Sequence, residues 1–387
     1  MTRWNPYAAA SWLLASLALL LAGCVDRYLP PVISSPQTYL VVDGFINLRG
    51  VTTVRLSRSR SLSTPTSPVE INASVSIRDE TGTSYPLFEQ GGGISTGTGT
   101  YISDYLTLSP THQYQLRLRT AAGREYASDL VAGKLTPAID QLSWASELNG
   151  VQVYLDAHDP AGATGYYRWT YQETWAFHSE YQSGYEYVNN QVQLRYEDIY
   201  HCWRSENSTA IKLSTTTGLS QDVVAKFPLT LLPGNSEKLG TRYSILVQQY
   251  AQTPEEYAYW DNLRKNTESL GTLFDPLPSQ LSGNVHGLTD ASELVLGYVG
   301  ATSVTERRLF IDRSELPAAN HFLTGYENCL PLDTVLLKNV PFYFSFQGSL
   351  PVYAIYGIGG GLLGYTGGAT DCVDCRSRGT NVRPSFW

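Results

Sequence analysis

The sequence predicts a mainly β fold: an N-terminal immunoglobulin-like antiparallel sandwich followed by a larger β-rich domain with one amphipathic helix. Short segments with apolar residues at every second position recur along the chain, a pattern typical of half-buried strands. The composition agrees, with 27 Tyr and 33 Gly against only 27 Lys and Arg together. A single segment has a clear helical pattern. We therefore expect sheets to form nearly all of the core.

The sandwich is predicted over residues 39–136. Apolar residues alternate with polar ones at Ala73, Val75 and Ile77, and the same alternation recurs in residues 114–118. The segment Asp79-Glu80-Thr81-Gly82 supplies a turn after one of these strands. The length of the segment suits one domain of the immunoglobulin-like kind.

The β-rich domain is predicted over residues 137–387. It contains an aromatic-dense region at residues 166–203, and Tyr and Trp are favoured in strands. Further strands are expected at residues 210–214, 242–250, 295–299, 308–312 and 352–358.

The one amphipathic helix is predicted from about Thr253 to Leu270, with its regular part at residues 254–270. Thr253 can cap the helix, Pro254 suits the first helical position, and Glu256 completes a Thr-x-x-Glu capping box. Residues spaced three or four apart then form one face to bury. That face contains Tyr257, Trp260, Leu263, Thr267 and Leu270.

The start of the chain predicts export and a lipid anchor. Residues 1–23 combine Arg3 with an apolar run at positions 8–22, which is too short to span a bilayer and typical of a signal peptide. Cys24 directly follows Leu-Ala-Gly, an arrangement that resembles a bacterial lipobox. We expect the thiol and the new amine of Cys24 to be acylated, which attaches the chain stably to a lipid bilayer.

The residues after Cys24 predict a spacer and a membrane. Residues 24–38 carry three prolines, which favour an extended tether. Val25 is not acidic, and the resemblance to sorted lipoproteins then favours the outer membrane. The net charge of −8 and the lack of Lys/Arg clusters argue against nucleic acid as a partner.

Four cysteines remain after Cys24, namely Cys202, Cys329, Cys372 and Cys375. An even number in an exported chain predicts two disulfides, with three pairings open. The Cys372-x-x-Cys375 spacing would also suit half a zinc site or a redox pair, but the sequence holds no matching second motif. We expect neither a metal nor a cofactor.

Three motifs could carry chemistry, and each has a simpler interpretation. Ser95 lies in a Gly-x-Ser-x-Gly match inside a Gly/Thr loop without helical pattern. Residues 359–364 spell Gly-x-Gly-x-x-Gly but precede no helix. Asp156, His158 and Asp159 could offer metal ligands or simply end a strand. We expect no catalytic residues.

The aromatic-dense region is the candidate binding surface. Its rings offer flat apolar area with polar tips, which suits a sugar, a peptide or a partner protein. Packing within the sheets is the alternative, and it is the commoner use of such residues. The candidates for contact are Trp169, Trp175, Tyr185 and Trp203.

Several stretches resemble the Bacteroidota lipoprotein family known as domain of unknown function 4249. These stretches are residues 243–250 (YSILVQQY), 253–260 (TPEEYAYW), 271–276 (GTLFDP), 282–285 (SGNV), 297–299 (GYV), 307–311 (RRLFI), 374–376 (DCR), 379–380 (GT) and 384–387 (PSFW). The resemblance implies an outer-membrane lipoprotein that accompanies a TonB-dependent transporter, and it defines no catalytic residues.

Two functions follow as expectations. The first is a non-enzymatic accessory protein that binds a TonB-dependent transporter or its substrate. The alternative is a surface glycan or peptide hydrolase, which only the aromatic region favours. Co-purification with a large barrel protein separates the two.

Overall fold

The computed structural model describes residues 38–60, 66–91, 97–268, 283–317, 322–345 and 348–387. Several predictions fall outside these residues: the signal peptide at 1–23, Cys24 with nearly all of its tether, Ser95, and Leu270 on the helix face. Contacts divide the chain into two units, residues 1–38 with 60–66, and residues 39–59 with 67–387. Nearly all of the first unit lies outside the described residues.

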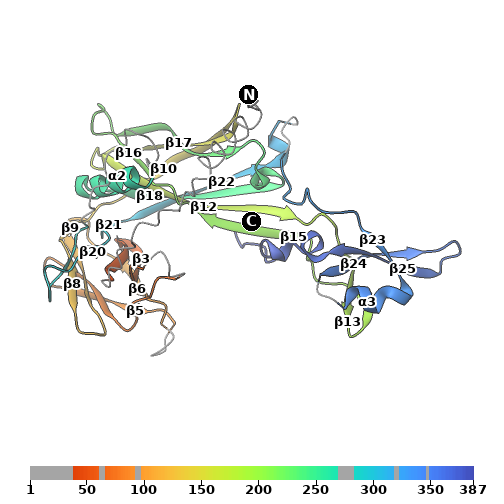
Figure 1. Cartoon of the computed structure of the whole chain (residues 1–387). Coiled ribbons are helices and arrows are strands. Elements are labelled where there is room, and N and C mark those ends of the chain that lie inside the picture. Colours follow the sequence, from red (N-terminus) through yellow and green to blue (C-terminus); the bar gives the residue numbers. More distant parts are fainter. Residues whose placement is uncertain (1–37, 61–65, 92–96, 269–282, 318–321, 346–347) are drawn as a thin grey trace, which may run out of the picture. The chain divides into compact units, whose positions relative to one another are not determined.

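The mainly β fold is confirmed, and its N-terminal part is a ten-stranded sheet (Figure 1). The order is β19-β8-β7-β4-β5-β6-β3-β1-β20, with β9 paired to β7. Eight of its strands come from residues 40–132: β1 Leu40–Gly44, β3 Arg49–Arg58, β4 Ser74–Asp79, β5 Ser84–Glu89, β6 Thr100–Thr107, β7 Gln113–Arg119, β8 Glu125–Ser128 and β9 Val131–Ala132. The other two, β19 Val285–Gly287 and β20 Val295–Leu296, come later in the chain, and β2 Ile46–Asn47 belongs to a separate small sheet. The predicted antiparallel strands are therefore present, hydrogen-bonded as one continuous sheet.

The N-terminal sheet needs a second segment of the chain to be complete. Strand β20 pairs in parallel with β1, β19 pairs antiparallel with β8, and β21 (Ala301–Thr302) pairs in parallel with β2. The predicted domain of residues 39–136 is thus incomplete, because residues 285–302 return to it. Strands of two or three residues are too short to carry a recognisable alternation, so the sequence pattern could not indicate this return.

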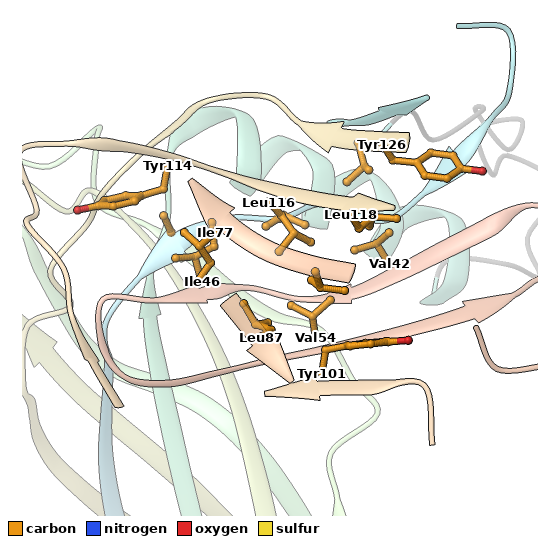
Figure 2. Close-up of a cluster of buried hydrophobic side chains, with 14 of the residues drawn as sticks. Val42, Ile46, Val54, Ile77, Leu87, Tyr101, Tyr114, Leu116, Leu118 and Tyr126 are labelled. Carbon is orange, nitrogen blue, oxygen red and sulfur yellow. The ribbon is translucent and has the colours of Figure 1, made fainter. Parts of the chain in front are cut away.

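One apolar core lies inside the N-terminal sheet. Val75 and Ile77, like Leu116 and Leu118, face the same interior, as their alternation predicts. Figure 2 shows Ile77, Leu116 and Leu118 among the side chains of neighbouring strands that point toward one another. Val285, Val295, Val299 and Ala301 belong to the same core, so the returning segment is packed as well as hydrogen-bonded.

The second part of the chain holds two further sheets around another core. One has the order β10-β11-β17 and the other β15-β12-β18-β22, with β16 paired to β12. Their strands are β10 Ile139–Glu147, β11 Gly150–His158, β12 Tyr166–His178, β15 His201–Asn207, β16 Lys212–Thr215, β17 Val223–Pro233, β18 Arg242–Ala251 and β22 Val304–Asp312. Buried residues of both sheets, including Val153, Trp169 and Val247, form a single cluster.

The C-terminal part is a small sheet with the order β23-β25-β24, beside the hairpin β13-β14. Its elements are β13 Tyr185–Val188, β14 Gln191–Leu194, β23 Asp333–Leu336, β24 Ser349–Tyr356, β25 Leu362–Ala369, and the short helices α3 Val340–Phe344 and α4 Thr370–Val373. Single 3-10 turns lie at η1 Glu237–Leu239, η2 Arg313–Glu315, η3 Leu337–Asn339 and η4 Cys375–Ser377. Strand β13 lies against β24 (Figure 1), so residues from the aromatic-dense region meet the end of the chain.

The predicted helix is α2, Pro254–Glu268, and its start is confirmed. The Thr253 hydroxyl accepts a hydrogen bond from the backbone N–H of Glu256 at 3.2 Å. The carboxyl of Glu256 does not return to the backbone of Thr253, as a capping box requires. It is buried and accepts a hydrogen bond from Gln252 Nε2 at 3.2 Å. Within the described residues, no helix is long and apolar enough to cross a membrane.

Candidate functional site

Two of the four predicted contact residues lie in the core. Trp169 is 0 % exposed and Trp175 is 1 % exposed, so their assignment to a binding surface is wrong. The physical reason is the alternation along β12, whose odd-numbered residues from Tyr167 to Trp175 are all buried. Polar residues such as Arg168 and Thr170 occupy the other face. That period of two is present in the sequence and identifies these rings as core residues.

Trp203 and Tyr185 are both half-buried. Trp203 packs edge to face against Trp387, with ring centroids 6.5 Å apart, and its backbone exchanges hydrogen bonds with Thr380. Its role here is to hold the end of the chain against β15. Tyr185 is the predicted contact residue that lines a hollow in the surface.

The candidate site is a tyrosine-lined hollow of about 620 Å³. It lies where the connections around the β13-β14 hairpin meet β24. Its aromatic lining consists of Tyr185, Tyr196, Tyr200, Tyr353 and Tyr356, and the other lining residues include Ser183, Arg195, Glu197, Asp198 and Val352. Tyr196 is 92 % exposed, Tyr356 61 % and Tyr353 49 %, so three rings present a large part of their surface to an incoming molecule.

The connection between β12 and β13 forms one wall of the tyrosine-lined hollow. Gly184 donates its N–H to the Val352 carbonyl at 3.1 Å, and the Ser183 hydroxyl donates to the Pro351 carbonyl at 2.7 Å. These bonds attach the wall to the outer edge of β24. Pro351 has no N–H to contribute to a ladder, which suits an edge strand.

A β-bulge in β24 orients the opposite wall. The register with β25 shifts between Pro351 and Ala354, and the Tyr353 N–H donates to the Thr366 hydroxyl at 2.9 Å instead of to a strand carbonyl. Bulges redirect side chains next to functional sites. Here the shift lets both Tyr353 and Tyr356 line the tyrosine-lined hollow, although they are three residues apart.

Arg195 is the interior cation of the tyrosine-lined hollow. Its side chain is only 7 % exposed, and its guanidinium lies 3.7 Å from the Glu186 carboxylate. Arg195 Nε donates to the Tyr185 carbonyl at 3.2 Å. Burial lowers the pKa of Arg195, and the charge of Glu186 opposes that change. Arg195 therefore fixes the hairpin that carries Tyr185.

The acidic residues of the tyrosine-lined hollow are held by their own partners. Asp198 accepts hydrogen bonds from the Tyr200 N–H at 2.8 Å and from His201 Nδ1 at 2.9 Å. Burial raises the pKa of Asp198, but these hydrogen bonds outweigh it and the net pKa is lowered. Glu197 accepts from Arg376 at 2.6 Å. Both carboxylates thus already accept hydrogen bonds from residues of the chain.

Burial and neighbouring phenols raise the pKa of Tyr185, and burial followed by the charges of Tyr353 and Glu180 raises that of Tyr200. Their hydroxyls are therefore neutral at physiological pH. Neutral phenols with exposed ring faces can donate and accept hydrogen bonds and offer apolar contact area. The arrangement suits recognition of a polar surface that also carries apolar groups.

Two disulfides hold this region, which confirms the prediction for all four cysteines and selects one of the three pairings. Cys202 is bonded to Cys375 and Cys329 to Cys372, with Cα atoms 5.9 and 5.8 Å apart. The Cys375 N–H donates to the Ile199 carbonyl at 2.9 Å, at the floor of the tyrosine-lined hollow. The Cys202–Cys375 bond therefore attaches the site to β15, the partner of β12.

The remaining motifs have structural roles. His158 pairs with Asp140 at 2.7 Å. Asp159 accepts hydrogen bonds from backbone N–H groups of the turn that follows it, and Asp156 accepts one from the backbone N–H of Lys226. Residues 359–361 form the turn between β24 and β25, with positive φ at Gly359 and Gly360. In the part of the chain that the structure describes, no group of three or more His, Cys, Asp or Glu could hold a metal ion.

The sequence pattern did not single out Tyr353 and Tyr356, the two exposed tyrosines of β24. They lie in the predicted strand at residues 352–358, far along the chain from the aromatic-dense region. Two tyrosines three apart on one strand point to opposite faces unless a bulge intervenes. The only available signal was the presence of two aromatic residues just before a Gly-rich turn.

Searches of solved structures return weak similarities that carry no argument about this chain. A pullulanase from Anoxybacillus sp. LM18-11 is 8 % identical with a TM-score of 0.16, and the match covers 54 % of this chain but only 24 % of the pullulanase. The B domain of a biofilm-associated protein is 7 % identical with a TM-score of 0.13, and the match covers 71 % of this chain and 86 % of that domain. No curated protein matches the sequence.

A family model does match, and it spans both the N-terminal sheet and the core sheets of the second part. The match covers residues 25–308, from the predicted tether to β22. This is well over half of the chain. The chain therefore belongs to the family described as domain of unknown function (DUF4249).

Proposed function

We propose that this chain is a lipid-anchored outer-membrane lipoprotein that binds a TonB-dependent transporter and performs no bond-making chemistry of its own. The observation that carries the proposal is the tyrosine-lined hollow. Tyrosine is enriched at protein interfaces because it combines apolar area with a polar tip and loses little conformational entropy. The lipobox-like start and the resemblance described above support the location and the kind of partner.

The surroundings of the hollow extend the candidate contact surface. The turn after β24 exposes Ile358 fully, and Leu363, the second residue of β25, is 49 % exposed. Ile358 lies two residues after Tyr356, and Leu363 follows Leu362, the partner of Tyr356 in the pairing of β24 with β25. Adjoining exposed apolar residues are typical of an interaction site, whereas isolated ones are not.

The rigidity of this region also supports binding. Disulfides, the Arg195–Glu186 pair and the bonds from residues 183–184 to β24 hold the walls in place. A pre-ordered surface loses less entropy on association, so more of the contact energy appears as affinity.

Lipid attachment has a direct test at Cys24. Cys24→Ala should abolish incorporation of a labelled fatty acid and leave the protein unprocessed or released from the membrane, because no thiol is available for alkylation. Val25→Asp is the matched control: it keeps the thiol, so labelling should persist while the protein stays in the inner membrane. Full labelling of Cys24→Ala would contradict the anchor.

The contact surface has its test at Tyr353 and Tyr356. The double change Tyr353→Ala with Tyr356→Ala should weaken association with the transporter by about 30-fold or more, since buried aromatic anchors at interfaces contribute about 2 kcal/mol or more. Affinity is measured between purified lipoprotein and purified transporter in detergent.

Tyr105→Ala is the matched control for this variant, because Tyr105 is 71 % exposed but belongs to β6 of the N-terminal sheet. It should leave affinity unchanged. Thermal unfolding of each variant shows whether the fold is intact. Equal affinity of the double variant and the control would remove the tyrosine-lined hollow from the proposal.

A further inference from the structure

Arg168 is a cation enclosed by aromatic rings. It lies on the face of β12 opposite Trp169 and is paired in register with Tyr250 of β18. Its guanidinium carbon is 4.3 Å from the centroid of the Tyr250 ring and 4.4 Å from that of Trp260 on α2. Such contacts stabilise the cation but do not neutralise its charge.

The guanidinium of Arg168 makes no hydrogen bond or ion pair with any residue in the described ranges, and its Nε is buried without a partner. Other interior cations are paired: Arg58 lies 2.7 Å from Glu70, Lys238 lies 2.7 Å from Glu173, and Arg195 lies 3.7 Å from Glu186. An enclosed charge without a counter-ion is costly, so this pattern indicates that an anion belongs beside Arg168.

The nearest acids do not meet this need. Glu256 is buried, packs against Gly300 and accepts the hydrogen bond from Gln252. Burial raises the pKa of Glu256, and the charge of Arg168 opposes that change. Asp43 is exposed and acts on Arg168 only from a distance.

Arg168 lines a hollow of about 780 Å³, distinct from the tyrosine-lined hollow. We call it the Arg168 hollow. Apolar and aromatic residues share its walls with polar and charged ones, among them Arg55. A volume of this size is within the range of small-molecule sites. The walls include Phe45, Tyr250, Tyr259, Trp260, Leu263 and Leu296.

We propose that the Arg168 hollow binds a small organic monocarboxylate, with its carboxylate against the edge of the Arg168 guanidinium and its apolar body against the surrounding rings. Since Tyr250 and Trp260 cover the guanidinium, an anion must approach in its plane, which is the geometry of bidentate carboxylate recognition.

The proposal is independent of the transporter-binding function and is tested with 3-phenylpropionate as the probe. Ligand-observed NMR with the full mature lipoprotein in detergent should show binding of the probe. The neutral analogue 3-phenylpropan-1-ol should bind at least about ten-fold more weakly, because it cannot form a hydrogen bond between two charged groups with Arg168.

Arg168→Gln should weaken the binding of 3-phenylpropionate at least about ten-fold. The matched control is Arg308→Gln, because Arg308 also stacks on a ring, 3.5 Å from the centroid of Phe386, but lies outside the Arg168 hollow. It should bind as wild type does. If Arg168→Gln does not fold, Leu263→Trp fills the hollow without changing charge and should also reduce binding.

Three results would overturn the proposal. In the first, the wild type does not bind 3-phenylpropionate, and in the second, the alcohol binds the wild type as tightly as 3-phenylpropionate does. In the third, a folded Arg168→Gln or Leu263→Trp variant binds 3-phenylpropionate as tightly as the wild type does. Neither variant should alter association with the transporter. A negative result with 3-phenylpropionate therefore does not affect the proposed binding of a transporter. A negative result in the transporter experiment likewise does not affect the proposed ligand site, which only the binding of 3-phenylpropionate tests.

Discussion

Trp169→Ala is expected to lower the free energy of unfolding by about 3 to 5 kcal/mol, the usual cost of emptying a buried tryptophan site. Trp169 is fully buried, stacks with Tyr167 at 5.8 Å and contacts Phe227 at 4.5 Å between ring centroids. Its Nε1 donates to Gln249 Oε1 at 2.8 Å, and the change leaves that buried oxygen without this donor. Equilibrium denaturation measures the loss.

Trp203→Ala is the comparison for this prediction, since Trp203 is also a β-strand tryptophan but is half-buried. The decrease in the free energy of unfolding should be clearly smaller for Trp203→Ala, because a half-buried side chain has less apolar area removed from water. If Trp169→Ala were as stable as wild type, or if it cost no more than Trp203→Ala, the assignment of Trp169 to the core would be wrong.

Removing the Cys202–Cys375 bond is expected to cost about 4 to 5 kcal/mol in the variant Cys202→Ser with Cys375→Ser. The bond joins residues 173 positions apart, and the chain-entropy model assigns the larger losses to the longer loops. Both cysteines are fully buried, so the substituted serines must also place hydroxyls in an apolar site.

The second disulfide provides the control within the same chain. Cys329–Cys372 joins residues 43 positions apart, and its removal should cost about 1 kcal/mol less by the same model. Denaturant midpoints of the two double variants measure the order. The reverse order would contradict the entropic account, and four free thiols in the native exported protein would contradict both bonds.

The sequence predicted those parts of the fold that depend on local pattern. Alternation placed Val75 and Ile77, and likewise Leu116 and Leu118, on one buried face, and Thr253 with Pro254 marked the start of α2. The return of residues 285–302 to the N-terminal sheet was not predictable, because its pairing with β1 and β8 is a tertiary property of very short strands.

The same limits explain the candidate site. The aromatic-dense region does contribute Tyr185, but the alternation within β12, which assigns Trp169 and Trp175 to the core, carries more information than aromatic content alone. Tyr353 and Tyr356 join Tyr185 only through the packing of β13 against β24 and through a bulge. Neither feature leaves a short-range signal in the chain.

The cysteines and the Glu256 side chain show a third limit. Four cysteines predicted two bonds but could not select a pairing, since that choice depends on where Cys202 and Cys375 meet in space. The Thr-x-x-Glu pattern predicted a capping box, yet Glu256, the buried residue of the first turn, accepts a hydrogen bond from Gln252 instead. Local rules give way where tertiary packing offers a side chain another partner.

The central claim is the proposal that this chain is an outer-membrane lipoprotein that binds a TonB-dependent transporter. The most direct test is to purify the chain from cell membranes after mild detergent extraction. The account predicts that a TonB-dependent transporter co-purifies in a fixed ratio, as identified and quantified by mass spectrometry, and that the purified lipoprotein cleaves neither glycan nor peptide. A lipoprotein that purifies without any transporter, or that cleaves a glycan or peptide at a rate abolished by one acidic substitution, would contradict it.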